Sequence, residues 1–424
     1  MQVFGNVTTT YQPKEIDMGM WKKMAGLALV AGTAAFAQPA LAQATIKIGA
    51  LNPYSGPLAL YGTEVTRGYE LATDKINAAG GLLGKKIELI RGDVTNAQQG
   101  ITTVEQLVTR DKVDMFVGTY ISGISLTASD AALRYNKLYW ETNAVAQALT
   151  ERRLPNFIRS GPDGSAFANT SSAAVRDLIA PALKKDMKGL KIWIEHEESI
   201  YGTSIAQAQK RILEAFGANI VGVGSHAANT ISLNDTVLRA KRAEPDVLIQ
   251  TGYVPDGNLL LRTMREQGLK PAAVLFVGTG DTPETLQALG AAYMEGILVV
   301  GYPRNDITDK FGPGNKAYLE AYRAKYKSDP VAPQGMAAYS GFLIMAEAVK
   351  AAGSVDPVKV QPAAAKLDIP ENTYPSGFGA KFDANFQNVR AQFTASQWQD
   401  GKMVTVFPKA AVLPGVTLRP LGRP

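Results

Sequence analysis

The sequence predicts a mixed α/β protein with two similar lobes, each built on a mainly parallel β-sheet covered by helices. Two observations carry this prediction. Short apolar runs alternate with amphipathic helical patterns, and this alternation restarts near residue 160, so that each series has the length of an ordinary domain. The 424 residues, 46% hydrophobic and 19% charged, have the composition of a folded globular protein.

The first series begins with the apolar run 45–51, which is typical of a buried strand. A helix is predicted over 63–79, because its apolar residues fall on one face and the pair Gly80-Gly81 follows as a stop signal. The same reasoning predicts further strands at 85–93, 113–118 and 138–142, and further helices at 98–110 and 128–135.

The second series follows the short segment 159–164. Its apolar runs again alternate with helical patterns, which indicates βαβ units and parallel pairing. The Pro-rich tail 413–424 is predicted to be extended or frayed. The predicted helices of this series are 166–183 and 203–216, and the predicted strands are 191–195, 218–223, 246–252 and 274–280.

Residues 1–42 are predicted to be a signal peptide with an extension upstream of its true start. The basic pair Lys22-Lys23 precedes the apolar run 24–37, and a small-residue cleavage motif occupies 40–42. The apolar run is too short and too rich in Ala and Gly to span a membrane comfortably. We therefore expect an exported protein that starts near Gln43, with Met18, Met20 or Met24 as alternative starts.

The composition excludes several classes of chemistry. The chain has no cysteine, which excludes disulfides, thiolate metal sites and cysteine nucleophiles, and it has only two histidines. No complete phosphate-binding, dinucleotide-binding or nucleophile-elbow motif occurs. The net charge of +6 is spread without basic blocks, which argues against nucleic-acid binding. We therefore expect no enzyme activity, no cofactor and no metal.

Two weaker patterns leave alternatives open. The acidic stretch 195–199 around His196 is interpreted as a solvated loop at a strand end, and a metal site is the alternative. His226 is interpreted as a surface loop residue. Tyrosines recur at helical spacing in 315–327, which favours core packing over a ligand stack.

The loops that follow the predicted strands are rich in Tyr, Ser, Thr, Gly and Asn. Open α/β sheets bind ligands at the carboxyl ends of their strands, and these side chains offer neutral hydrogen bonds and close backbone approach. The sequence therefore predicts a small-molecule binding protein with its ligand in a cleft between the lobes. The loops are 55–62, 118–123, 141–146, 197–202, 251–257 and 278–284.

Several of these stretches resemble the branched-chain amino acid binding proteins, the type I periplasmic receptors of ABC importers. The resemblance covers about 45–405 and is carried by IGALNPYSGPLALYG, DKINAAGGLLGKKIELIRGD, GTYISGISLTASD, ESIYGTSIAQAQ and IQTGYVPDGNLLLRTMREQGLK. It implies a Venus-flytrap fold with a three-strand hinge at 160–162, 301–303 and 375–377. It also implies a monomer in the periplasm that works with an ABC permease at the inner membrane and binds no nucleic acid.

The resemblance further implies how the chain divides and where the first lobe meets its ligand. The N-terminal lobe would comprise 43–160 plus 301–375, and the C-terminal lobe and tail 161–300 plus 376–424. In the first lobe, Tyr61 matches a tyrosine that packs on the ligand, and Ser122 matches the serine that takes its carboxylate. Backbone groups around Asn143 and Val145 match a loop that grips the carboxylate and the amine.

In the second lobe, Tyr201 and Tyr253 match tyrosines that close over the ligand. The sequence departs from the family pattern at two positions that would contact the amine of the ligand. Val145 stands where amino-acid binders carry a threonine, and Gly280, followed by Asp281, aligns with their ammonium-binding glutamate.

If Asp281 takes the ammonium, a branched-chain amino acid fits; if it does not, an aromatic or other non-amino carboxylate, or an amide, fits better. A sensory ligand-binding module and a secreted enzyme are the alternatives from other classes.

Overall fold

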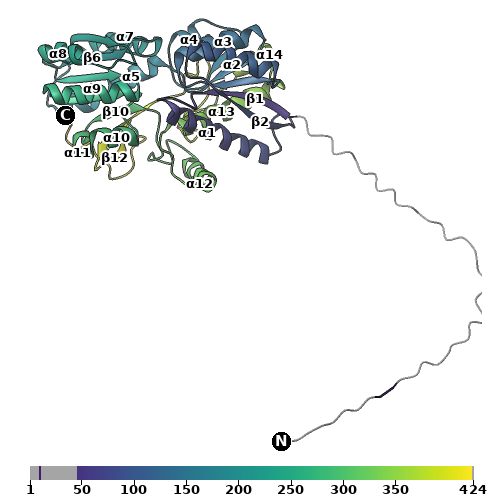
Figure 1. Ribbon diagram of the computed structural model, residues 1–424. Coiled ribbons are helices and arrows are strands. Elements are labelled where there is room, and N and C mark those ends of the chain that lie inside the picture. Colours follow the sequence, from purple (N-terminus) through teal and green to yellow (C-terminus); the bar gives the residue numbers. More distant parts are fainter. Residues whose placement is uncertain (1–8, 11–44, 423–424) are drawn as a thin grey trace, which may run out of the picture. The chain divides into compact units, whose positions relative to one another are not determined.

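The computed structural model describes residues 9–10 and 45–422, and these contain two β-sheets flanked by helices (Figure 1). The predicted signal peptide, its cleavage site and the alternative starts lie outside the described residues, apart from positions 9 and 10. Within residues 9–10 and 45–422, every helix is too short or too polar to span a lipid bilayer.

The first sheet has five parallel strands in the order β2-β1-β3-β4-β5. Its two faces bury separate apolar clusters, with Ile48 in one and Leu51 in the other, as a parallel sheet covered on both faces requires. Its strands are β1 (Thr45–Asn52), β2 (Lys86–Asp93), β3 (Met115–Gly118), β4 (Tyr139–Glu141) and β5 (Phe157–Arg159). Its connecting helices are α1 (Ala59–Ala78), α2 (Ala97–Thr109), α3 (Ser122–Arg134) and α4 (Ala148–Glu151).

The second sheet has seven strands in the order β12-β11-β10-β9-β8-β6-β7. The strands from β6 to β10 pair in parallel, whereas β11 and β12 extend one edge antiparallel. The strands are β6 (Lys191–Glu197), β7 (Asn219–His226), β8 (Val247–Thr251), β9 (Ala273–Val277), β10 (Leu298–Gly301), β11 (Thr394–Gln399) and β12 (Lys402–Phe407).

The helices of the second sheet include an irregular one where a single helix was predicted over 166–183. It consists of α5 (Gly164–Ala174), the π-helical turn η1 (Val175–Ile179) and α6 (Ala180–Ala182). Pro181 lacks the N–H group that a regular helical turn needs, so the ladder is interrupted there. The remaining helices are α7 (Ile200–Ala215), α8 (Asn234–Ala243), α9 (Val254–Gln267), α10 (Pro283–Leu289) and α11 (Ala291–Met294).

Three later helices, α12 (Asn315–Tyr326), α13 (Gln334–Ala352) and α14 (Pro357–Ala364), return to the first sheet. Helix α13 lies directly against α1. The two backbones are so close that a Cβ atom added at Gly68 would lie only 2.0 Å from the Gly335 carbonyl oxygen. Tyr318 and Tyr322 on α12 are buried in the core, as the tyrosine spacing predicts.

The chain passes between the sheets three times: from β5 to α5, from β10 to α12, and again before β11. The third passage lies later than the segment 375–377 predicted for it. Asn388 is still bound to the end of β5 in the first sheet. Its backbone N–H donates to the Arg159 carbonyl and its Nδ2 donates to the Ser160 carbonyl, both at 2.9 Å. We therefore place the third passage, and the lobe boundary predicted at 375/376, between 389 and 393.

The tail is extended as predicted, but it is not frayed over the described residues 413–422. The Arg419 N–H donates to Gln397 Oε1 at 2.9 Å, and Gln397 Nε2 donates back to the Arg419 carbonyl at 3.1 Å. This reciprocal pair anchors the tail along β11.

Candidate functional site

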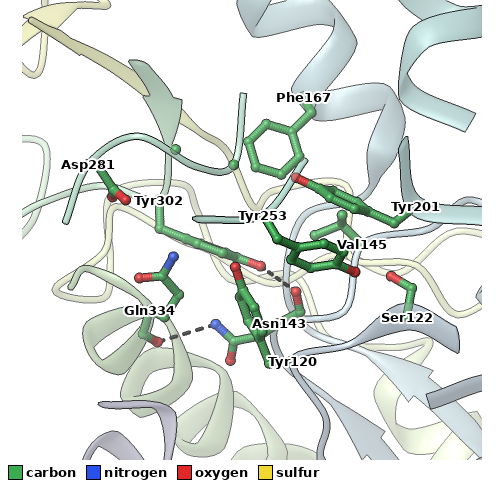
Figure 2. Close-up of a pocket in the computed structure, with 12 residues that line it drawn as sticks. Tyr120, Ser122, Asn143, Val145, Phe167, Tyr201, Tyr253, Asp281, Tyr302 and Gln334 are labelled. Atoms are coloured by element: carbon green, nitrogen blue, oxygen red, sulfur yellow. Dashed lines mark hydrogen bonds between the residues drawn. The ribbon is translucent and has the colours of Figure 1, made fainter. Parts of the chain in front are cut away.

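A cavity of about 390 Å³, its mouth included, lies between loops from the carboxyl ends of both sheets (Figure 2). Its position agrees with the cleft that the sequence predicts. Six of the seven residues proposed from the sequence line it, and Tyr61 lies close behind. The lining residues are Tyr120, Ser122, Asn143, Val145, Phe167, Tyr201, Tyr253, Gly278, Asp281, Gly301, Tyr302 and Gln334.

Ser122 opens helix α3 directly at the cavity. The first N–H groups of a helix have no acceptor within the helix, and the helix dipole makes this end favourable for an anion. The Ser122 hydroxyl oxygen accepts the Ala146 N–H at 3.2 Å, so its own O–H group is free to donate elsewhere. This end of the cavity is therefore suited to a carboxylate.

The loop that carries Asn143 and Val145 is held by two fully buried charged residues, Glu141 and Arg159. Burial raises the pKa of Glu141 to about 7, although its hydrogen bonds oppose this shift. The Glu141 carboxylate accepts from the backbone N–H groups of Thr119, Thr142, Asn143 and Ala144 and from the Ser125 hydroxyl. The Arg159 guanidinium donates to the carbonyls of Ala144 and Ala146, to Thr150 Oγ1 and to Gln387 Oε1.

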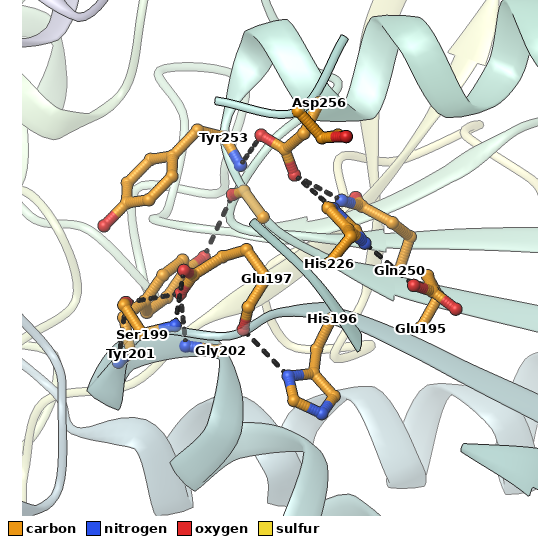
Figure 3. Close-up of polar contacts among 12 residues, drawn as sticks. Glu195, His196, Glu197, Ser199, Tyr201, Gly202, His226, Gln250, Tyr253 and Asp256 are labelled. Atoms are coloured by element: carbon orange, nitrogen blue, oxygen red, sulfur yellow. Dashed lines mark hydrogen bonds and ion pairs between the residues drawn. The ribbon is translucent and has the colours of Figure 1, made fainter. Parts of the chain in front are cut away.

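Tyr201 and Tyr253 enter the cavity from the second sheet, and each is positioned by a buried carboxylate (Figure 3). Glu197 accepts the N–H groups of Ser199 at 2.8 Å and Gly202 at 2.7 Å, which shapes the turn that presents Tyr201. Asp256 accepts the Tyr253 N–H at 2.9 Å at the start of α9. Neither Glu197 nor Asp256 is among the residues that line the cavity, so these carboxylates support the two tyrosines from behind its wall.

The interpretations of 195–199 as a solvated loop and of His226 as a surface residue are wrong, because Glu195, Glu197 and His226 are all buried. The His226 ring lies between Glu195 Oε1, at 2.8 Å from Nδ1, and Asp256 Oδ2, at 3.1 Å from Nε2 (Figure 3). Burial lowers the pKa of His226, but the two carboxylates outweigh it and raise the pKa to about 9. The structure does not support the alternative of a metal site, because the described residues contain no group of three His, Cys, Asp or Glu side chains that could hold a metal ion.

Asp281 lies in the cavity and is 5% exposed. The Tyr61 hydroxyl donates to its Oδ1 at 3.4 Å, and Arg304 Nη1 lies 3.6 Å from its Oδ2. Burial raises the pKa of Asp281, against the opposing effects of Arg304 and the Tyr61 hydroxyl. Tyr61 itself stacks on Tyr120 with ring centroids 4.8 Å apart, so it lies one layer behind the cavity wall.

Aromatic rings form most of the remaining wall and connect the two halves of the cleft. Tyr120 from the first half meets Tyr253 from the second edge to face at 6.4 Å, and Tyr253 packs on Tyr201 at 5.2 Å. The Tyr302 hydroxyl donates to the Asn143 carbonyl at 2.7 Å. These rings offer an apolar surface to the middle of a ligand.

The sequence did not identify six of the lining residues. Tyr120 stands two positions before Ser122 in a loop singled out above, and Tyr302 lies in a predicted hinge, so a local signal existed for both. Phe167 and Gln334 lie in helices, where no local pattern distinguishes them from packing residues. Gly278 and Gly301 line the cavity through their backbone.

Comparison with known proteins identifies relatives over nearly the whole chain. The sequence model of the family described as periplasmic binding protein matches residues 45–402. The Leu/Ile/Val-binding protein homolog 7 of Brucella suis is 38% identical over 392 residues, which cover 92% of this chain and 97% of that protein. The Leu/Ile/Val-binding protein homolog 8 of Brucella abortus is 36% identical over 373 residues, which cover 88% and 93%.

Solved structures show the same fold. The branched-chain amino acid transporter substrate binding protein LivJ from Streptococcus pneumoniae, in complex with isoleucine, has a TM-score of 0.72 at 25% identity, covering 87% of this chain and 99% of that one. A solute binding protein from R. palustris in complex with benzoate has a TM-score of 0.70 at 21% identity, covering 89% and 99%. The chain therefore belongs to the periplasmic binding protein family, as a type I member with the two-lobed Venus-flytrap fold and as a homologue of the Leu/Ile/Val-binding proteins.

Proposed function

We propose that the protein is a periplasmic receptor that captures a small amino acid between its lobes and delivers it to the permease of an ABC importer. The relatives support the transport role, because LivJ from Streptococcus pneumoniae is described as a transporter substrate binding protein. Branched-chain amino acids are the first ligands to test, since the relatives in Brucella are named for leucine, isoleucine and valine.

A single observation carries the amino-acid proposal: one cavity holds both an anion-binding end at Ser122 and a buried carboxylate, Asp281. A ligand with a carboxylate and an amine would complement both groups. A ligand without an amine would leave Arg304, at 3.6 Å, as the cationic partner of this 5% exposed carboxylate, and an ammonium that approaches more closely would compensate its burial better.

Ligand capture would work by lobe closure. Tyr120 and Tyr253 already meet across the cleft, and the Tyr61 hydroxyl reaches Asp281. A ligand that contacts both halves binds the closed form better than the open form, so it shifts the population toward closure. Solution scattering should therefore show a smaller radius of gyration with a tight ligand; an unchanged radius would contradict the closure mechanism.

The ligand class can be tested by thermal-shift screening followed by calorimetry. The panel contains leucine, isoleucine and valine, the deaminated analogue 4-methyl-2-oxopentanoate, and benzoate. Amine-bearing ligands should raise the unfolding midpoint. Asp281→Asn should weaken at least tenfold the binding of any ligand whose amine reaches this carboxylate, whereas Asp309→Asn, which changes an exposed carboxylate, should leave its binding unchanged.

An aromatic carboxylate is the second candidate, favoured by the aromatic side chains that line the cavity. It would bind through Ser122 and pack between tyrosine rings. Binding of benzoate without binding of any amino acid would support this candidate and overturn the amino-acid proposal.

A further inference from the structure

The polar groups of the cavity are separated. Figure 2 shows Ser122 and Val145 at one end and Asp281 and Gln334 at the other, with tyrosine rings between them. The two ends therefore do not serve the same part of a ligand. We call the second end the Asp281–Gln334 subsite.

Gln334 presents an unused acceptor in this subsite. The residue is the first of helix α13 and is 3% exposed, and its carbonyl oxygen accepts Asn143 Nδ2 at 3.2 Å, which fixes its backbone. Its side-chain oxygen Oε1 is buried and has no hydrogen-bond partner within the described part of the chain. Buried amide oxygens are usually paired. Gln334 lines the cavity, so a ligand there could supply the missing donor.

Asp281 adds a charge to the same subsite. Its two neighbours, the Tyr61 hydroxyl at 3.4 Å and Arg304 Nη1 at 3.6 Å, are farther away than in well-formed hydrogen bonds. The carboxylate thus retains capacity for a closer donor. Among the twelve lining residues, all within the described part, only Asp281 carries a charged side chain.

The Ser122 end lacks such a charge. In an α-amino acid the carboxylate and the ammonium are attached to one carbon atom, so both would lie at the same end. No acidic side chain of the described residues lines the cavity beside Ser122, and its neighbour Val145 is apolar. An α-ammonium there would have no counter-charge, whereas an ammonium at the far end would meet Asp281 and Gln334.

We propose that the Asp281–Gln334 subsite binds an amine at the end of the ligand opposite its carboxylate. The preferred ligand is then a linear ω-amino carboxylate whose methylene chain lies between the tyrosine rings. This inference rests on the proposed function and narrows the ligand class within it.

The test is a length series measured by calorimetry on the wild-type protein at pH 7. The probes are 4-aminobutanoate, 5-aminopentanoate and 6-aminohexanoate, with leucine, pentanoate and pentylamine for comparison. One chain length should bind at least tenfold more tightly than leucine and than both compounds that lack one charged group. A preference for one length is expected because closure of the lobes on a ligand would set one separation between the two ends.

A variant tests the subsite directly. Gln334→Met keeps the side-chain length and removes the acceptor, so it should weaken the best ω-amino ligand about tenfold and pentanoate much less. Gln98→Met, on the exposed surface of α2, is the matched control and should change neither affinity. Thermal unfolding of both variants checks that they fold.

The outcomes separate the two proposals. If leucine, isoleucine or valine binds as tightly as every ω-amino ligand or more tightly, the subsite assignment is wrong, and the receptor function stands. If no compound of either panel binds, the proposed function itself fails. Equal losses for pentanoate and the ω-amino ligand in Gln334→Met would also overturn the assignment, because they would indicate a packing role alone.

Discussion

Glu141 and Arg159 occupy paired positions on the neighbouring parallel strands β4 and β5, and both side chains are fully buried. Glu141 accepts the N–H groups at the start of the adjoining loop, and Arg159 donates to the carbonyl oxygens of Ala144 and Ala146 at 3.1 and 2.8 Å. The loop that carries Asn143 into the cavity is thus held from both sides before any ligand arrives, which reduces the entropy lost on binding.

Arg159→Met should lower the free energy of unfolding by about 3–5 kcal/mol, because several buried acceptors lose their donor and Glu141 loses a buried cation. Urea denaturation measures this change. Arg153→Met is the control: Arg153 is exposed and, among the described residues, its guanidinium hydrogen-bonds to the Asn385 side chain, so the effect of the substitution should stay within about 0.5 kcal/mol. Equal effects of the two variants would contradict the role of Arg159.

His226→Gln should destabilise the protein in a pH-dependent way. The folded pKa of His226 is about 9, above the ordinary value of 6.5, so the protonated ring contributes stability fully below pH 6.5 and loses it as pH rises to 9. Wild type and variant should differ by about 3 kcal/mol at pH 6 and progressively less toward pH 9. Denaturation curves across this range check the prediction, with the exposed Lys210→Gln as control; a constant difference would refute it.

Tyr61 should act mainly through its ring. Tyr61→Phe removes only the long contact to Asp281 at 3.4 Å, so ligand affinity should fall less than about fivefold. Tyr61→Ala also removes the stack on Tyr120 and should lower ligand affinity about tenfold or more. Calorimetry with the best ligand distinguishes the two. A Phe variant as weak as the Ala variant would show that the hydroxyl carries the effect.

Binding of an amine-bearing ligand should weaken as the pH falls. Burial raises the pKa of Asp281, and only its ionised form pairs with an ammonium. Affinity should therefore decrease as pH falls through this raised pKa, and the decrease should be absent in Asp281→Asn. Calorimetry between pH 7.5 and 5 measures both proteins. The same decrease in both would assign the titration to another group.

Much of the architecture followed from local patterns. Alternating apolar runs and amphipathic helices predict βαβ units, and parallel strands bring their carboxyl ends to one edge. For this reason Ser122, Asn143 and Val145 lie together in the cavity, as do Tyr201 and Tyr253, although the predicted roles of these residues in ligand binding stay predictions.

The fold class, the two lobes and the strand-end loops could be predicted from local sequence, because hydrophobic periodicity and turn residues act over a few positions along the chain. Tertiary structure alone decided which distant groups complete the site. Gln334 reaches the cavity because α13 packs on α1 where Gly68 meets Gly335, and His226 becomes charged because β6 and α9 bring Glu195 and Asp256 to its ring. Burial and charge pairing depend on neighbours far away in sequence, and no local pattern encodes them.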